Sequence, residues 1–116
     1  MLPNIENWKT QVRKGYLELC LLSLIDVRKR LYGLEMLEIL EKAGLPLKEG
    51  TLYPLLNRMT QEDVLAATWE TEAAKGHPRK FYALTKNGKR VLHEMQSEFD
   101  RMNETYQKLN REGEKK

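Results

Sequence analysis

The chain has 116 residues, of which 41% are hydrophobic and 32% are charged. This composition is typical of a soluble folded domain and excludes a wholly disordered chain, while the length favours one domain with a small core that an oligomer would help to stabilise. The net charge of +3 does not by itself indicate nucleic acid. A single cysteine, Cys20, excludes an intrachain disulfide and therefore a secreted disulfide scaffold.

The N-terminal residues have no signal-peptide pattern, because acidic and polar residues precede any apolar stretch. The most apolar run, Leu17 to Val27, contains Glu18 and Asp26 and is too short to span a bilayer. We therefore expect no membrane contact and a cytoplasmic location. Cys20 lies in this run, where a buried thiol behaves as a small hydrophobic side chain, and a redox role is the less favoured alternative.

The first predicted helix is capped by Asn4, with Ile5, Trp8 and Val12 at helical spacing behind it. Gly15 either bends or interrupts this helix. The following segment, YLELCLLSLI, is apolar nearly all round and predicts a central core helix. Trp8 lies outside this block, and it either packs in the core or lines a cavity or a dimer contact.

The second predicted helix covers Tyr32 to Ala43 and ends at Gly44, a typical C-terminal residue. The basic run Arg28 to Arg30 precedes it. This run is either a solvated turn or a phosphate contact near the helix start.

The third predicted helix lies within Lys48 to Asp63, because apolar residues recur there at i, i+3, i+4 and i+7, as Leu52, Leu55, Leu56 and Met59. The opposite face carries hydroxyl, amide and guanidinium groups, which can contact bases and phosphates in a DNA groove. These polar residues are Thr51, Tyr53, Asn57, Arg58 and Gln61. An ordinary amphipathic surface helix is the alternative. Pro54 falls in the first turn if Thr51 is the N-cap, and it removes one backbone bond if the helix begins earlier.

Two short strands are predicted next, at Val64 to Thr71 and Arg79 to Leu84, joined by a turn that contains Gly and Pro. Six basic residues and no acid lie between Lys75 and Arg90, so the positive charge is local. A helix–turn–helix unit followed by two strands with a basic connection is a winged helix-turn-helix arrangement. The expected fold is therefore mostly α with a small two-stranded β wing, and the basic wing residues are Lys75, His77, Arg79 and Lys80.

A long last helix is predicted behind a Thr85 cap. Apolar residues recur along it at alternating steps of three and four, which is a heptad seam. We expect this helix to pair with a helix of a second subunit, although packing within the chain is the alternative. The seam consists of Leu92, Met95, Phe99, Met102, Tyr106 and Leu109. The expected division is a winged domain over 1–84, a C-terminal dimerisation helix over 85–110 and a disordered tail over 111–116.

Four stretches of the chain resemble the PadR family of winged-helix transcriptional regulators: RKGYLELCLLSLI, LYGLEMLEIL, KEGTLYPLLNRM and GHPRKFYALTKNG. The resemblance covers about residues 13 to 90. It implies a homodimer joined through the last helix, a recognition helix at Lys48 to Glu62 and a basic wing at Ala74 to Lys80. The DNA-contacting residues that it implies are Tyr32, Lys48, Thr51, Tyr53, Asn57, Arg58, Lys75, His77, Arg79 and Lys80.

The short C-terminal part is similar to a subgroup that includes multidrug-sensing repressors. In that subgroup a tryptophan on the last helix stacks on flat ligands in a pore at the dimer interface. Phe99 stands at that position here, and Trp8 and Met95 can join it in binding a planar aromatic molecule. The alternative is that these side chains only fill the interface. Two further departures from the family pattern are Asp63, where glycine is usual, and His77, where arginine is usual.

The sequence leaves three hypotheses for the function of this chain. The first is a dimeric repressor that binds a palindromic DNA operator, with a ligand at the dimer interface changing its affinity. The second is a winged-helix module that binds a protein and does not bind DNA. The third, an enzyme, has no support, because two distant histidines and one cysteine make no metal site and no nucleophile or phosphate-loop motif is present. We expect no cofactor and no metal.

Overall fold

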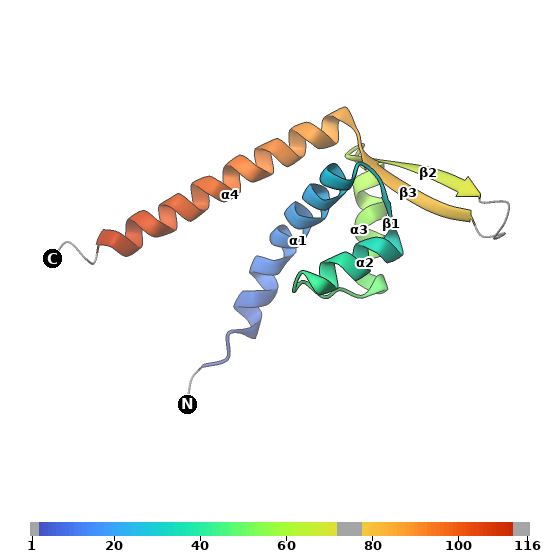
Figure 1. Cartoon of the computed structure of the whole chain (residues 1–116). Helices are drawn as coiled ribbons and strands as arrows, with labels where there is room; N and C mark the ends of the chain where they lie inside the picture. The colour runs from blue at the N-terminus through green and yellow to red at the C-terminus, as the bar shows by residue number, and fades with distance from the viewer. Residues whose placement is uncertain (1–2, 72–77, 113–116) are drawn as a thin grey trace.

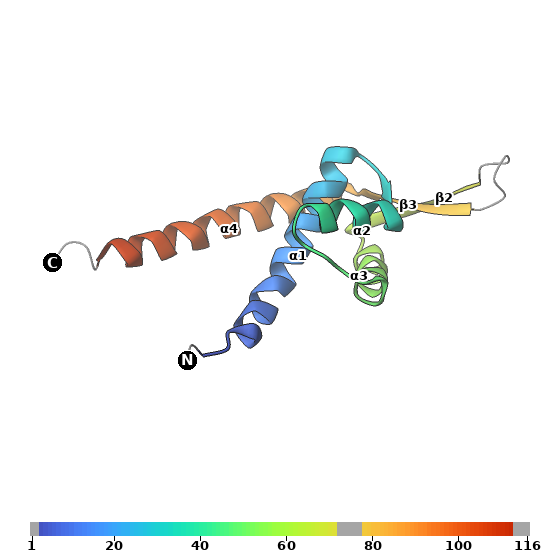
Figure 2. The same cartoon turned by 60° about the horizontal axis from the view of Figure 1, so that its bottom comes forward.

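The computed structural model describes residues 3–71 and 78–112, and it is mostly helical with one small antiparallel sheet (Figure 1). A single body contains the first three helices and the sheet, and the last helix projects from it as a long arm (Figure 2). No helix among the described residues is both long and apolar enough to cross a membrane. The elements in chain order are α1 (Glu6–Arg28), β1 (Leu31–Tyr32), α2 (Gly33–Lys42), α3 (Glu49–Gln61), β2 (Leu65–Thr71), β3 (Pro78–Leu84) and α4 (Lys86–Glu112).

The core forms where one face of α1 meets α2, α3 and the sheet. Burying these apolar side chains is the main stabilising contribution to the fold. The buried core residues are Leu17, Leu21, Leu22, Ile25, Leu31, Met36, Leu40, Leu52, Leu56, Met59, Val64, Leu65, Tyr82 and Leu92. The three fully buried α3 residues among them confirm the predicted apolar face of this helix.

Helix α1 is continuous through Gly15, and its N-cap is Ile5, so the predicted Asn4 cap was wrong by one residue. The Asn4 side chain still accepts a hydrogen bond from the Glu6 N–H at 2.9 Å, from one position before the cap. The prediction of a helix buried nearly all round was wrong. Only one face is covered, and Tyr16 and Val27 are exposed on the other. Trp8 is 62% exposed, which excludes the core-packing alternative within the chain.

The sheet has a third strand that the sequence analysis did not predict. The two-residue strand β1 pairs with β3, so the strand order is β1–β3–β2, with Leu31 opposite Tyr82 and Tyr32 opposite Phe81. The predicted hairpin of β2 and β3 is confirmed, with Ala67 opposite Tyr82 and Trp69 opposite Lys80. Strand β1 ties the start of α2 to the base of the wing.

Helix α3 begins at Glu49 with Lys48 as its N-cap, so of the two alternatives considered the helix begins earlier than a Thr51 cap would place it. Pro54 therefore lies inside the helix, where it has no N–H to donate to the carbonyl four residues earlier. That carbonyl belongs to Gly50, and both residues are exposed, so water can satisfy it.

Helices α2 and α3 end in the same way. The N–H of Leu45 bonds to the Leu40 carbonyl at 2.8 Å across Gly44, and that of Val64 bonds to the Met59 carbonyl at 2.9 Å across Asp63. Both bridging residues have positive φ, 93° for Gly44 and 61° for Asp63. These are Schellman endings, which need a left-handed residue, and aspartate fills that position with more strain than glycine.

A junction joins the end of α3, the base of the hairpin and the start of α4. The Thr85 hydroxyl donates to the Asp63 carbonyl at 2.6 Å and accepts from the Gly88 N–H at 2.8 Å, which confirms the predicted cap. The Thr85 N–H bonds to the Val64 carbonyl at 3.1 Å. Gly88 lies directly against that carbonyl, and a β-carbon on it would overlap the oxygen. We call these four residues the junction.

We expect Gly88→Ala to lower the free energy of unfolding by about 2–4 kcal/mol, because the new methyl group meets backbone rather than a side chain that can move. Gly50→Ala is the matched control, since nothing lies within 4 Å of its β-carbon position and alanine favours a helix. Urea denaturation of both variants measures the difference. A Gly88→Ala protein as stable as Gly50→Ala would contradict the junction geometry.

Candidate nucleic-acid interface

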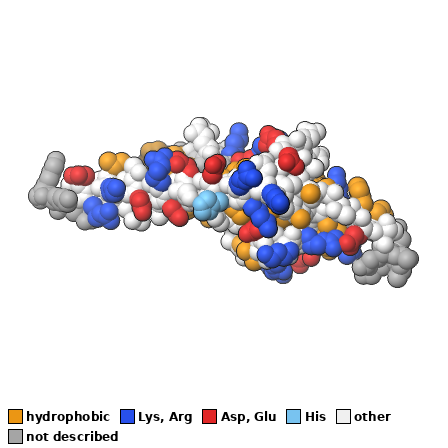
Figure 3. Space-filling model, turned by 90° about the horizontal axis from the view of Figure 1, so that it is seen from above, with side chains coloured by type: hydrophobic (Ala, Val, Ile, Leu, Met, Phe, Trp, Pro, Cys, Tyr) orange, Lys and Arg blue, Asp and Glu red, His pale blue; other side chains and the backbone are white. Residues whose placement is uncertain are grey.

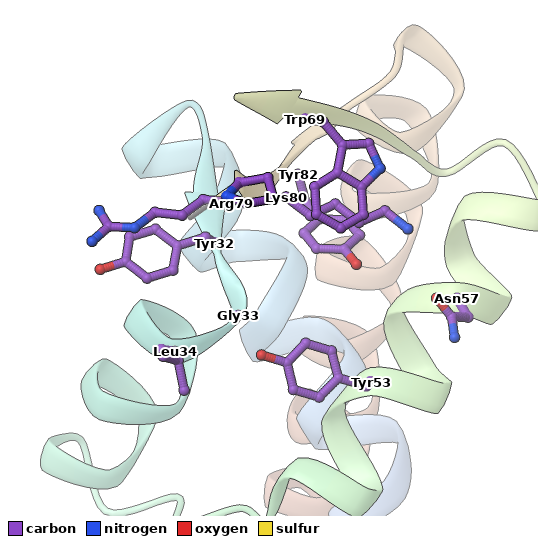
Figure 4. A pocket seen from close by; sticks show the side chains of 10 residues that line it. Tyr32, Gly33, Leu34, Tyr53, Asn57, Trp69, Arg79, Lys80 and Tyr82 are labelled. Carbon is purple, nitrogen blue, oxygen red and sulfur yellow. The ribbon is translucent and has the colours of Figure 1, made fainter. Parts of the chain in front are cut away.

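A groove of about 520 Å³ lies between α3, the start of α2 and the hairpin (Figure 4). Helix α3 contributes Tyr53 and Asn57 to its wall. The other eight lining residues come from the start of α2 and from the two longer strands: Tyr32, Gly33, Leu34, Trp69, Pro78, Arg79, Lys80 and Tyr82. None of the ten lining residues is an acid, and two of them, Arg79 and Lys80, are cations.

The tyrosine of α3 lies against the first residue of α2. A β-carbon on Gly33 would lie 2.7 Å from the Tyr53 Cζ atom, so the ring can lie here only because residue 33 is glycine. Tyr82 lies deeper in the groove. Burial, and to a smaller extent the neighbouring Tyr53, raises the pKa of the Tyr82 hydroxyl. A tyrosine hydroxyl is protonated at neutral pH even without this shift. The groove floor is therefore neutral and can donate hydrogen bonds.

The cations of the groove lie against aromatic rings. The Arg79 guanidinium carbon is 4.8 Å from the centre of the Tyr32 ring, and the Lys80 ammonium is 5.6 Å from that of Trp69 and 5.7 Å from that of Tyr82. Such cation–π contacts are weak at exposed sites, but they favour one orientation of the Arg79 guanidinium and of the Lys80 ammonium. The two cations point to opposite sides of β3, as alternation along a strand requires.

The outer side of the sheet, toward which Arg79 points, also holds Arg30. The Arg30 guanidinium lies 3.9 Å from the centre of the Phe81 ring and pairs with Glu70 at 2.7 Å. Phe81 in turn meets the Tyr32 ring edge-on at 5.4 Å. Arg30 is thus bound to the hairpin, and this favours a structural role over the phosphate contact considered for the basic run.

The structure brings together half of the ten predicted DNA-contacting residues in this groove: Tyr32, Tyr53, Asn57, Arg79 and Lys80. Lys48 is exposed at the start of α3. Lys75 and His77 lie outside the described residues.

Thr51 and Arg58 lie on the other edge of α3, which faces α1. They line a shallow hollow together with Glu18. The Arg58 guanidinium forms an ion pair with Glu18 and a second one with Glu62 at 2.9 Å. Arg58 is about half exposed in these pairs, so its charge is shared between the protein and solvent.

Trp69 is the main groove residue that the sequence analysis did not select. Its strand was predicted, but the face on which it lies depends on the register with β3, which places it beside Lys80. Leu34, an exposed apolar residue at the start of α2, was also not selected.

A separate hollow of about 330 Å³ lies between α1 and α4. Met95 and Phe99, two of the three predicted ligand-binding residues, line it. The Phe99 ring centre is 6.0 Å from that of Tyr16, and the adjacent Cys20 raises the pKa of the Tyr16 hydroxyl. Trp8 does not line this hollow, since it precedes Tyr16 by about two helical turns.

The predicted seam of α4 is increasingly exposed toward the C-terminal end. Exposure rises from 4% at Leu92 to 40% at Phe99 and 68% at Leu109, because the arm projects beyond the body. The face of the arm that Figure 3 shows carries both acidic and basic side chains. Three apolar residues at the start of α1 are also exposed, namely Ile5 at the N-cap and Trp8 and Val12 in the first turns. We call the exposed α4 seam with these α1 residues the apolar face.

The comparisons with known proteins agree with this geometry. The model of the PadR-like family of transcriptional regulators matches residues 21–94. A PadR-like transcription factor from Bacteroides fragilis is 38% identical, with 90% of this chain and 99% of that chain covered and a TM-score of 0.75. A PadR family regulator from Eggerthella lenta is 31% identical, with 90% of each chain covered and a TM-score of 0.79. A PadR-like regulator from Bacillus cereus is 34% identical, with 85% of this chain and 95% of that chain covered and a TM-score of 0.75.

The matched residues include α2, α3 and the sheet, which are the elements that form the groove, and also the junction. The chain therefore belongs to the PadR-like family of transcriptional regulators.

Proposed function

We propose that this regulator is a homodimeric repressor that acts in the cytoplasm on a palindromic DNA operator, and that a planar aromatic ligand releases it. The observation that carries the DNA-binding part is the groove beside α3, which has two cations and no acid among its lining residues. Such a surface attracts phosphates, and the exposed side of α3 beside it has the size to enter a major groove.

The DNA contacts divide into two classes. Asn57, Tyr53 and Thr51 on α3 offer amide and hydroxyl groups to base edges and so bias the sequence. Phosphates are held by the basic residues and by Tyr32, and these contacts set the affinity. The basic residues in this class are Lys48, Arg79 and Lys80, with Lys75 and His77 in the connection between the strands. Arg58 joins them after it leaves Glu18.

The dimer forms through the apolar face. Phe99, Met102, Tyr106 and Leu109 are all exposed at heptad spacing, and each such side chain contributes about 1.5–3 kcal/mol when it is fully buried. A second copy of the chain presents the same exposed α4 residues, so the two seams can cover each other. Residues 85–110 are then the dimerisation helix, and residues 1–84 are the DNA-binding domain.

Control by a ligand is a separate part of the proposed function. The hollow between α1 and α4 is lined by Phe99, Met95 and Tyr16, and it opens beside the apolar face. A flat molecule between the rings of two subunits changes how the arms pack. Since α4 is joined to α3 at the junction, this changes the distance between the two recognition helices and thus the affinity for DNA.

Replacing either groove cation tests the DNA-binding assignment. We expect Arg79→Ala and Lys80→Ala to weaken binding to every duplex and to lower the slope of log K against log salt by about one unit each. Lys108→Ala on the outer side of α4 removes the same charge and leaves the slope unchanged. Fluorescence anisotropy at several salt concentrations measures this. Unchanged slopes for both groove variants would show that the hairpin does not contact phosphate.

A charge in the seam tests the dimer. We expect Met102→Glu to raise the dissociation constant of the dimer about 100-fold or more, because two carboxylates would be buried against apolar side chains. Gln107→Glu adds the same charge off the seam and leaves the dimer intact. Sedimentation velocity over a range of concentrations separates the two species. A Met102→Glu protein that remains dimeric would place the interface elsewhere.

Calorimetry with planar aromatic cations and phenols tests whether such a ligand binds beside Phe99. We expect Phe99→Leu, which keeps the apolar volume but removes the ring, to weaken binding about ten-fold, since stacking is lost. Phe99→Trp restores it. Absence of binding heat for all compounds, or equal binding to the Phe99→Leu protein, would leave only the interface-filling role for Phe99.

A further inference from the structure

Trp69 is exposed in a way that the fold does not explain. It is a large aromatic residue with 63% of its surface accessible, although it lies on the same side of the sheet as the buried Leu65 and Tyr82. Its ring extends this apolar side beyond the core and over the groove, where it faces α3 (Figure 4). Among the described residues, most of the Trp69 surface is therefore left uncovered.

The surroundings of Trp69 indicate what covers it. The Lys80 ammonium lies on the Trp69 side of the hairpin, 5.6 Å from the ring centre, and Asn57 and Tyr53 form the opposite wall. The groove thus offers a cation, an apolar ring and hydrogen-bonding groups side by side, with no acid. One strand of a duplex presents the matching groups, because each nucleotide has an anionic phosphate next to the apolar carbon face of its deoxyribose.

The position of the groove agrees with such an occupant. When α3 lies in the major groove, the sugar–phosphate strand that borders that groove passes alongside the helix. The hairpin of β2 and β3 lies next to α3, and the groove separates the two (Figure 1). A duplex bound through α3 in this way would place its bordering strand over the groove of about 520 Å³ between α3 and the hairpin, which Trp69 overhangs.

We infer that Trp69 is a direct DNA contact, which packs its indole ring on the deoxyribose of this strand while Lys80 binds the adjacent phosphate. The inference rests on the proposed DNA-binding function. The contact is independent of sequence, because the sugar is the same at every base pair. It is also independent of salt, because the indole is uncharged and displaces no counterion.

Fluorescence tests the contact directly. The chain has two tryptophans, so the Trp8→Phe protein has only Trp69 as an emitter. We expect duplex DNA to change the emission of Trp69, with the change saturating at the concentration at which a gel shift of the same protein is complete. Complete binding in the gel without any change in emission would overturn the inference and leave the proposed function intact.

Affinity tests separate a direct contact from an indirect one. We expect Trp69→Ala to weaken binding to operator and to unrelated duplex by the same factor, about ten-fold, as for loss of one packed aromatic ring, with an unchanged salt slope. Trp69→Phe keeps most of the affinity. Thr68→Ala, on the same strand but on the opposite face, is the control and binds as the unaltered protein does.

Two other results would contradict the contact. A salt slope that falls in Trp69→Ala as it does in Lys80→Ala would mean that Trp69 only holds the lysine in place. Full affinity in Trp69→Ala would mean that the ring does not touch DNA. If the unaltered protein binds no duplex at all, the proposed function itself fails, and this inference fails with it. Thermal unfolding of each variant confirms that the exposed substitution leaves the fold unchanged.

Discussion

The arrangement of this protein depends on the junction, where the Thr85 hydroxyl bonds to the Asp63 carbonyl and Gly88 lies against the Val64 carbonyl. Three elements meet there: the end of α3, the base of the hairpin and the start of α4. The contact is made by backbone groups, which cannot move aside as a side chain can, so it sets the direction in which α4 leaves the body. The left-handed conformation of Asp63 is needed to bring its carbonyl to this point, and some strain is retained there.

This constraint links the two surfaces of the molecule. The groove and the exposed side of α3 lie on one side of the junction, and the apolar face of α4 lies on the other. If two arms pair, the junction transmits their geometry to the two recognition helices without a flexible segment between them. A ligand beside Phe99 then acts on DNA affinity through rigid helices, which is the requirement for coupling between distant sites. Arg58 adds a second connection, because its partner Glu18 belongs to α1 and lies next to the hollow that Phe99 lines.

Much of the fold could be predicted from local patterns. The periodicity of Leu52, Leu56 and Met59 placed α3, Thr85 marked the start of α4, and alternation placed the hairpin. What could not be predicted depends on contacts between distant segments. Strand β1 has only two residues and exists because β3 pairs with it, and the Arg58 partner is 40 residues away in the chain. Likewise, the direction of Trp69 follows from the register of its strand, and the half-exposure of α1 follows from the number of helices that cover it.

The central claim is that α4 pairs two chains so that their α3 helices enter successive major grooves of one operator. Hydroxyl-radical footprinting on the DNA upstream of the protein's own gene, with excess non-specific competitor, tests it most directly. Pairing through α4 predicts two protected regions related by a dyad, with centres about 10 base pairs apart, and loss of both in the Met102→Glu protein. A single protected region, or protection that is the same for the Met102→Glu protein, would contradict a paired arrangement set by α4.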